Sequence, residues 1–167
     1  RPIGAVGGSV ESAKIINGLL KLGSAVTPYQ SNTELQKALT SGQIDAAVIV
    51  AGAPSAFVAG LPARQFKLLT LRANQDLSAV YTMTKLQYDN LGGGETVDTI
   101  ATQALFVTRT FSSQEMLTNL AMLRKCFYDN VGKLKDKTGT HPKWQDVKTD
   151  DRGRWEWYEL PNVGGSK

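Results

Sequence analysis

The residues best suited to hold a ligand stand near the start of the chain, where a short apolar run ends in Gly7, Gly8 and Ser9 and a helical pattern begins. At a strand-to-helix junction, the first backbone N–H groups of the helix, the serine hydroxyl and the positive end of the helix dipole suit a carboxylate, a phosphate or another acceptor. The alternative is a tight turn in which Ser9 only caps the helix. The glycine spacing matches neither the dinucleotide fingerprint G-x-G-x-x-G nor the P-loop.

Two further features belong to this candidate site. Glu11 lies in the first helical turn, where a carboxylate favours the helix but competes with an anion for the same N–H groups. It would instead hydrogen-bond an ammonium or a hydroxyl group of a ligand. The loop Gly52-Ala53-Pro54 follows the strongest apolar run, and loops after the strands of open α/β sheets line ligand crevices. An ordinary connecting loop is the alternative for these three residues.

The residue types needed for catalysis or metal binding are sparse. Cys126 and His141 are the single cysteine and the single histidine, so an internal disulfide is impossible and a zinc site would need both to converge. Cys126 lies in a helical pattern and is predicted to be a small buried residue. The nucleophile pattern G-x-S-x-G and acid–base pairs at a diagnostic spacing are missing from the sequence. The sequence favours a binding protein over an enzyme and predicts no cofactor and no metal.

Composition and charge are those of an ordinary globular protein. The chain has 167 residues, 41% hydrophobic and 20% charged, with a net charge of +4. Asp136 interrupts Lys133, Lys135 and Lys137, which form the nearest approach to a basic block and fit a solvated helix end, so nucleic acid is not an expected partner. Apolar runs such as AAVIVAGA are far shorter than the roughly 20 residues of a membrane span.

Alternating strand and helix patterns in the first ninety residues predict an α/β fold. We expect a mostly parallel sheet from Ile3 to Leu71 with flanking helices. The predicted strands are IGAVGG, AVTPY, IDAAVIVAG and FKLLTL, and the predicted helices cover 9–22, the segment from Ser31 to Gly42, and 55–60. Ser31 and Glu34 form a capping box for the second of these helices.

The pattern changes after Arg72. A polar segment over 73–78 and a mixed run over 80–88 precede VDTIATQALFVTR, an extended run long enough to cross between two lobes. A long helix is predicted from Ser112, which forms a capping box with Glu115. The tail carries Trp144, Trp155 and Trp157, which we expect to pack against the body rather than to form a ligand cage.

Several segments, taken in order, resemble the second half of the TAXI-type solute-binding receptors of TRAP transporters. They are GAVGGSVESAKIINGLLKLG, TELQKALTSGQIDAAVIVAGAPSAFVAGL, KLLTL and TVDTIATQALFVTRTFSSQEMLTNLAMLRKCFYDN. The resemblance covers residues 3–130 and lies in a glycine–serine turn, a G-x-[IV]-D-A stretch before a glycine–proline loop, and a crossing strand before a serine-capped helix. Val10 and Glu11 stand where the family usually continues its turn with small residues.

The resemblance implies a type II periplasmic-binding-protein fold with the ligand between two lobes. It implies an α/β lobe over 1–92, a crossing or hinge strand over 93–111, and a C-terminal helix and tail over 112–167 that return to the other lobe. It places Gly8, Ser9 and Val10 at one wall of the cleft and the loop 52–54 at another. It adds Tyr88, Thr99 and Gln103 as ligand contacts, for which plain strand packing is the alternative. Because the first lobe of the family precedes the glycine–serine turn, the chain is expected to be part of a longer protein.

The expected function is that of an extracytoplasmic or periplasmic solute-binding protein. It would capture a small polar, carboxylated or amino-acid-like solute and present its closed form to membrane transporter subunits. One alternative is a ligand-sensing domain of a regulator or receptor. Another is an enzyme built on the same architecture.

Overall fold

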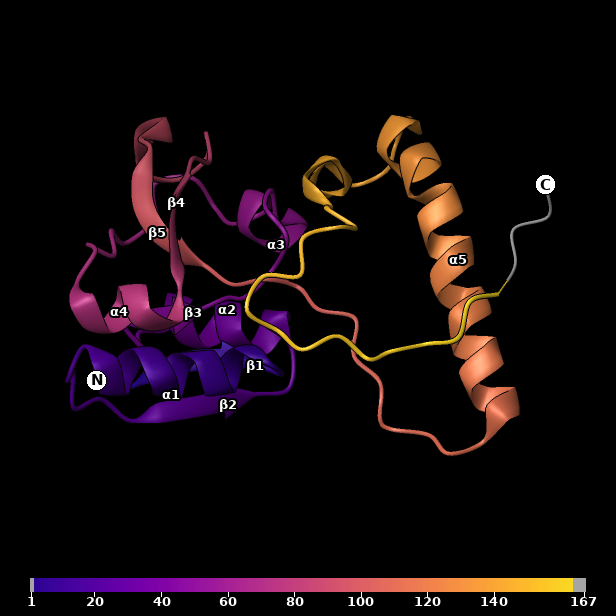
Figure 1. Cartoon of the computed structure of the whole chain (residues 1–167). Helices are drawn as coiled ribbons and strands as arrows, with labels where there is room; N and C mark the ends of the chain where they lie inside the picture. Colours follow the sequence, from indigo (N-terminus) through magenta and orange to yellow (C-terminus); the bar gives the residue numbers. More distant parts are fainter. Residues whose placement is uncertain (1, 164–167) are drawn as a thin grey trace. The chain divides into compact units, whose positions relative to one another are not determined.

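The computed structural model describes residues 2–163. The chain divides into two compact units, Arg1–Gln103 and Ala104–Lys167, whose elements are labelled in Figure 1. The division falls inside the stretch 93–111, which the resemblance assigns to a crossing strand. Each unit is described by itself below.

A small parallel sheet forms the first half of unit 1. It contains β1 (Ile3–Val6), β2 (Val26–Tyr29) and β3 (Ala46–Val48) in the order β2-β1-β3. Helix α1 (Ser9–Leu19) connects β1 to β2, and α2 (Asn32–Thr40) connects β2 to β3. The register pairs Ile3 with both Val26 and Ala46. This arrangement confirms the predicted α/β class with a parallel sheet and flanking helices.

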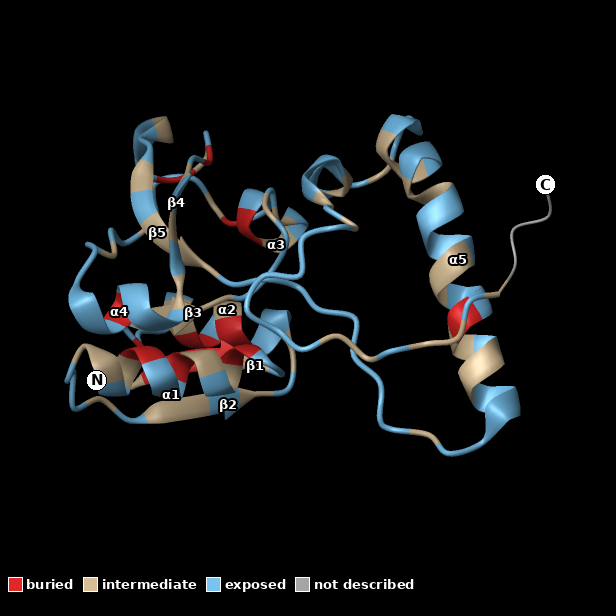
Figure 2. Cartoon of the chain, viewed as in Figure 1, coloured by how far each residue is buried: buried red, intermediate tan, exposed pale blue. Residues whose placement is uncertain are grey.

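The two helices cover opposite faces of this sheet because successive residues of a strand point to opposite sides. Ile3 and Ala5 of β1 pack with Ala13 of α1. On the other face, Gly4 lies under Leu35 of α2 and Ile44, so that an added Cβ would be only 2.6 Å from Leu35 Cδ1. Figure 2 shows buried residues concentrated in β1, α1 and α2.

Local signals in the sequence explain the start and end of α2. The Ser31 hydroxyl accepts a hydrogen bond from the Glu34 N–H at 3.2 Å, and Glu34 Oε2 accepts from the Gln30 N–H at 3.1 Å. The predicted cap is therefore confirmed, with the glutamate reaching one residue further back than in a standard capping box. Gly42 follows the helix with a φ of +71°, a conformation that favours glycine.

The second half of unit 1 is a compact arrangement around an antiparallel strand pair. It contains the helices α3 (Ala56–Ala59) and α4 (Gln75–Val80), the strands β4 (Thr82–Leu86) and β5 (Val97–Ala101), and the 3₁₀ turn η1 (Gly92–Gly94). β4 and β5 pair with Thr84 opposite Thr99. The core of this half consists of Val58, Leu61, Tyr88 and Leu91.

One prediction for this region was wrong. The run 66–71 does not become a further parallel strand: Phe66 and Leu68 pack against the core around Tyr88, and the Leu71 N–H bonds to the Asp98 carbonyl at 2.9 Å. Its apolar residues therefore pack at the antiparallel pair instead of widening the parallel sheet. The polar segment after Arg72 contains α4, whose start is fixed by the Asn74 side chain accepting from the Leu77 N–H at 2.7 Å.

Unit 2 contains the long helix α5 (Gln114–Asp136) and the turn η2 (Pro142–Asp146). The extended run predicted up to Arg109 ends as a strand at Ala101, and residues 102–111 have no regular structure. The cap of α5 is Ser113 instead of Ser112. Cys126, predicted to be buried, is exposed. None of the described helices is long and apolar enough to cross a membrane.

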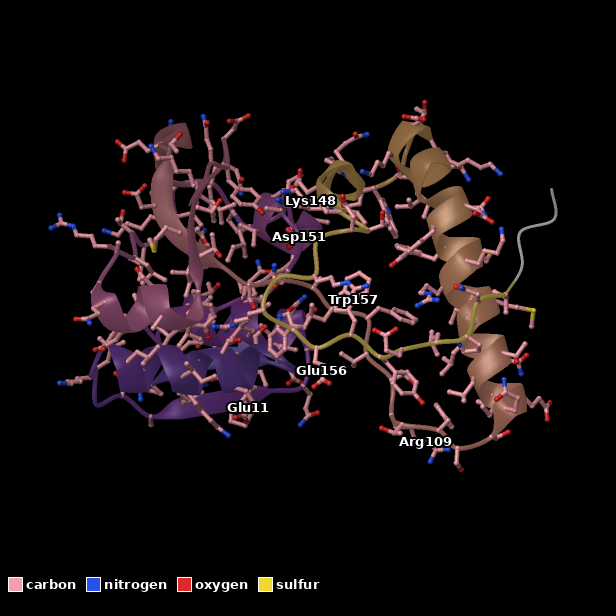
Figure 3. All side chains as sticks on the ribbon, in the orientation of Figure 1. Glu11, Arg109, Lys148, Asp151, Glu156 and Trp157 are labelled. Carbon is pink, nitrogen blue, oxygen red and sulfur yellow. The ribbon has the colours of Figure 1, made fainter. Side chains whose placement is uncertain are left out.

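The tryptophans of unit 2 play different roles. Trp144 of η2 packs at a tilt on Phe127 of α5, with ring centroids 6.4 Å apart, as the packing prediction requires. Trp155 is 48% exposed and lies near the Arg154 guanidinium, so the prediction was wrong for this ring. Trp157, labelled in Figure 3, lies near the Arg152 guanidinium at 4.9 Å.

Candidate functional site at the carboxyl edge of the parallel sheet

The strand order of the parallel sheet reverses direction between β1 and β3 in unit 1. The chain goes from β1 to β2 on one side and then passes β1 again to form β3 on the other side. Because β1 and β3 are parallel neighbours, the segments that follow them start at the same sheet edge. In open α/β sheets such a reversal is where ligands bind, outside the carboxyl ends of the strands. Residues 7–9 follow β1 and residues 49–55 follow β3 at this edge.

A hydrogen bond joins the two segments there. The Ser9 hydroxyl oxygen accepts from the Val50 N–H at 3.0 Å, across 41 residues of sequence, and Ser9 is only 8% exposed. Gly8 holds the cap position without a side-chain bond and Ser9 is the first helical residue, so the alternative in which Ser9 only caps the helix is excluded. The hydroxyl is used to fix the β3 loop against the start of α1.

The glycines of the junction leave its surface accessible. Gly7 has a φ of +54°, which favours glycine, whereas Gly8 is helical with a φ of −61°. An added Cβ at either position would meet nothing within 4 Å. The backbone at the start of α1 is therefore open to close approach.

Val10 and Glu11 differ in their surroundings. Val10 is half-buried and packs against the core formed by Ile3, Ala5 and Ala13. Glu11, labelled in Figure 3, is exposed, and its carboxylate pairs with Lys14 at 2.7 Å. An exposed ion pair one helical turn apart is weak. Because Glu11 is also exposed, its carboxylate is accessible to solvent beside the junction.

The loop after β3 is held at its far end by Tyr88. The Tyr88 hydroxyl accepts from the Ser55 N–H at 2.6 Å, while the ring is 7% exposed and packs with Val58, Leu61 and Leu91. Gly52 and Pro54 are exposed, Ala53 is half-buried, and the Ala53–Pro54 peptide bond is cis. The Tyr88 hydroxyl therefore contacts Ser55, the residue directly after the predicted loop 52–54.

Thr99 and Gln103 lie elsewhere in unit 1. Thr99 belongs to β5, where it faces Thr84 of β4, and Gln103 is exposed two residues beyond that strand. The structure thus brings together residues 8–9, the loop 50–55 and Tyr88, while Thr99 and Gln103 belong to the antiparallel half of the unit.

One residue that sequence reasoning missed also holds this loop region. Asn90 Nδ2 donates to the carbonyl oxygens of Val58 at 3.1 Å and Leu61 at 2.9 Å. Asparagine is common in turns, so its place before a glycine-rich run signals only a turn. The bonds span 32 and 29 residues, and only the folded chain brings their partners together.

Other described surface features belong to other elements. Two depressions run along α2, one of them lined by Thr33, Gln36, Lys37, Thr40 and Ser41. In unit 2, a hydrogen bond from Lys143 and its positive charge lower the pKa of Asp146 below the ordinary value of 3.8. Within residues 2–163, no group of three or more His, Cys, Asp or Glu side chains is placed to hold a metal ion.

Comparisons with protein-family models, with curated proteins and with solved structures found no match to this chain.

Proposed function

We propose that the chain is the ligand-binding α/β lobe of an extracytoplasmic solute-binding protein of the TAXI type, with a type II periplasmic-binding-protein fold. The observation that carries this proposal is the bond between Ser9 and Val50 at the reversal of strand order. It joins the glycine–serine turn and the β3 loop, which the resemblance assigns to two walls of one cleft.

The chemistry of this edge favours a carboxylate or another small acceptor. The start of α1 offers backbone N–H groups and the positive end of the helix dipole, and the missing side chain of Gly8 allows an acceptor to approach them. A serine hydroxyl carries one donor hydrogen and two acceptor lone pairs. Because the Ser9 oxygen accepts from the Val50 N–H, the Ser9 hydroxyl hydrogen would donate a hydrogen bond to the solute.

The edge presents Gly7, Gly8, Gly52 and Pro54 to solvent, which fits one open wall of a binding site. The depressions described above are lined by α2 and its flanks, away from residues 7–9 and 50–55. One wall leaves a solute half in water, so binding to this chain alone is expected to be weak. A second lobe would close over the solute, and the closed form would be presented to membrane transporter subunits outside the cytoplasm.

The test is a titration of the whole chain followed by NMR of its backbone amides. Acetate, succinate and L-glutamate are compared with the uncharged acetamide, succinamide and L-glutamine. We expect the three carboxylates, at millimolar concentrations, to shift the backbone N–H signals of Gly8, Ser9 and Gly52. The uncharged compounds should shift these signals less.

Gly8→Val gives the variant test, because it adds a side chain in open space and a helical conformation that valine can adopt. We expect the variant to keep its fold. Its affinity for the carboxylates, measured by the same titration, should fall about tenfold or more. Gly18→Val is the matched control, since Gly18 lies in the same helix, away from the junction, and is equally open. Equal carboxylate binding by wild type and Gly8→Val, or no binding by wild type, would refute the proposal.

A further inference from the structure

We propose that Asn90 is a positioning residue of this site: it fixes the segment 50–61 in the shape that receives the solute. The inference rests on the proposed function for its ligand, but its structural part stands on the contacts of Asn90 itself.

The first contact set closes the end of α3. Val58 lies in this short helix and Leu61 lies two residues beyond its end. The Val58 carbonyl also accepts from the Leu61 N–H at 3.2 Å, so Asn90 adds a second donor to it. One amide nitrogen of Asn90 donates to both carbonyl oxygens, at 3.1 Å and 2.9 Å. Both bonds are partly buried, and hydrogen bonds shielded from water are stronger than exposed ones.

The second contact lies two residues before Asn90. Tyr88 accepts from the Ser55 N–H, which precedes α3. The turn 88–90 thus holds the same segment at its start through an N–H group and at its end through two carbonyl groups. At the upstream side, Ser9 holds the Val50 N–H.

Two of these four bonds, at Val50 and Ser55, flank the exposed part of the loop, and the two from Asn90 hold the helix end that follows it. Between Val50 and Ser55, Ala51, Gly52 and Pro54 are exposed, whereas Val58 and Leu61 are buried with Tyr88 and Leu91. Fixing a binding loop before the ligand arrives reduces the ordering entropy that binding would otherwise cost. Removing the Asn90 amide should therefore weaken solute binding without touching the residues that contact the solute.

The variants separate the hydrogen bonds from the volume of the side chain. Asn90→Ala removes the donor. Asn90→Asp keeps the size and shape but places carboxylate oxygens against two carbonyl oxygens, which repel them. If Asn90 acted through packing alone, Asn90→Asp would be the milder change. If it acts through donation, Asn90→Asp is the more damaging one.

Asn17→Ala is the matched control. Asn17 also makes two side-chain bonds to backbone, from Nδ2 to the Ser24 carbonyl at 2.9 Å and from the Ser24 N–H to Oδ1 at 3.1 Å. These bonds lie at the end of α1 and before β2, at the opposite edge of the sheet. The control therefore loses a similar number of hydrogen bonds away from the loop.

The experiment measures amide hydrogen exchange of the ligand-free whole chain and succinate binding by NMR. For Asn90→Ala we expect exchange in 50–61 to rise about tenfold over wild type, from the loss of two bonds of ordinary strength. We expect succinate affinity to fall about threefold to tenfold, with larger effects for Asn90→Asp. Asn17→Ala should leave both quantities within about twofold of wild type.

The outcomes distinguish this inference from the proposed function. Unchanged exchange in 50–61, an effect of Asn90→Asp smaller than that of Asn90→Ala, or faster exchange with unchanged succinate affinity would each refute the positioning role. If Asn90→Asp fails to fold, Tyr88→Phe, which removes only the acceptor for Ser55, is expected to speed exchange at Ser55 and to weaken succinate in the same direction. A wild-type chain that binds none of the carboxylates refutes the proposed function instead.

Discussion

At the scale of single residues, the contact between β1 and α2 depends on the missing side chain of Gly4. A Cβ added at Gly4 would lie 2.6 Å from Leu35 Cδ1 and 3.1 Å from Tyr29 Cε2. It would lie closer still to Ile44 Cδ1. Leu35 and Ile44 are 0% and 2% exposed, so the ends of both side chains would have to shift within a packed core. The close approach of the sheet and the helix therefore favours glycine at this position.

We predict that Gly4→Ala destabilises the protein by about 1–3 kcal/mol, the usual cost of forcing extra volume into a packed core. Gly18→Ala, at an open position in α1, should stabilise the chain by up to about 1 kcal/mol because alanine favours a helix. Urea unfolding followed by circular dichroism measures both. A Gly4→Ala midpoint at or above that of wild type would show that the core around Leu35 can repack.

At the scale of the element, two neighbouring serines, Ser112 and Ser113, could each cap the start of α5. The sequence pattern favours Ser112, three residues before Glu115. In the structure Ser113 is extended, with a φ of −73° and a ψ of 123°, and its hydroxyl accepts from the Met116 N–H at 3.4 Å. The cap still joins residues three positions apart, but they are Ser113 and Met116 instead of Ser112 and Glu115.

Ser113→Ala is therefore expected to destabilise unit 2 by about 1 kcal/mol, the typical value of a helix cap. Ser112→Ala, the matched control, should change stability by less than about 0.5 kcal/mol. Thermal unfolding of the two variants, with α5 followed by NMR, compares them directly. If Ser112→Ala were the more damaging change, the helix would begin one residue earlier than the structure shows.

At the scale of the whole molecule, an irregular stretch lies where the two units divide. Residues 102–111 have no regular structure, and Phe106 and Val107 are 88% and 80% exposed. Proteases cut accessible, irregular chain much faster than packed elements. The large aromatic side chain of Phe106 is a suitable target for chymotrypsin.

We expect brief chymotrypsin treatment to cut first after Phe106, giving fragments 1–106 and 107–167 by mass spectrometry. Tyr88, which is buried, should remain uncut at the same time point. Phe106→Ser should slow this first cut several-fold while leaving the other fragments unchanged. A first cut within β1, α1 or α2 would contradict the division into units.

Sequence alone determined the features that depend on neighbours a few residues away. The Ser31 cap of α2 and the glycine after that helix involve contacts within four residues, so their signals stand side by side in the sequence. The alternation of strand and helix patterns likewise predicted the parallel sheet, because parallel strands need a crossover between them. Both candidate segments, 8–9 and 52–54, were found because each follows a predicted strand.

Tertiary structure decided whatever depends on partners distant in the sequence. The run 66–71 is as apolar as a strand, yet it packs at the antiparallel pair, because burial is favourable wherever an apolar surface is offered. The Ser9 hydroxyl accepts a hydrogen bond from Val50, 41 residues away, and no pattern around Ser9 in the sequence indicates that partner. In the sequence, Asn90 indicated only a turn. The residue type shows that a side-chain amide can donate hydrogen bonds, but it does not show which carbonyl groups accept them.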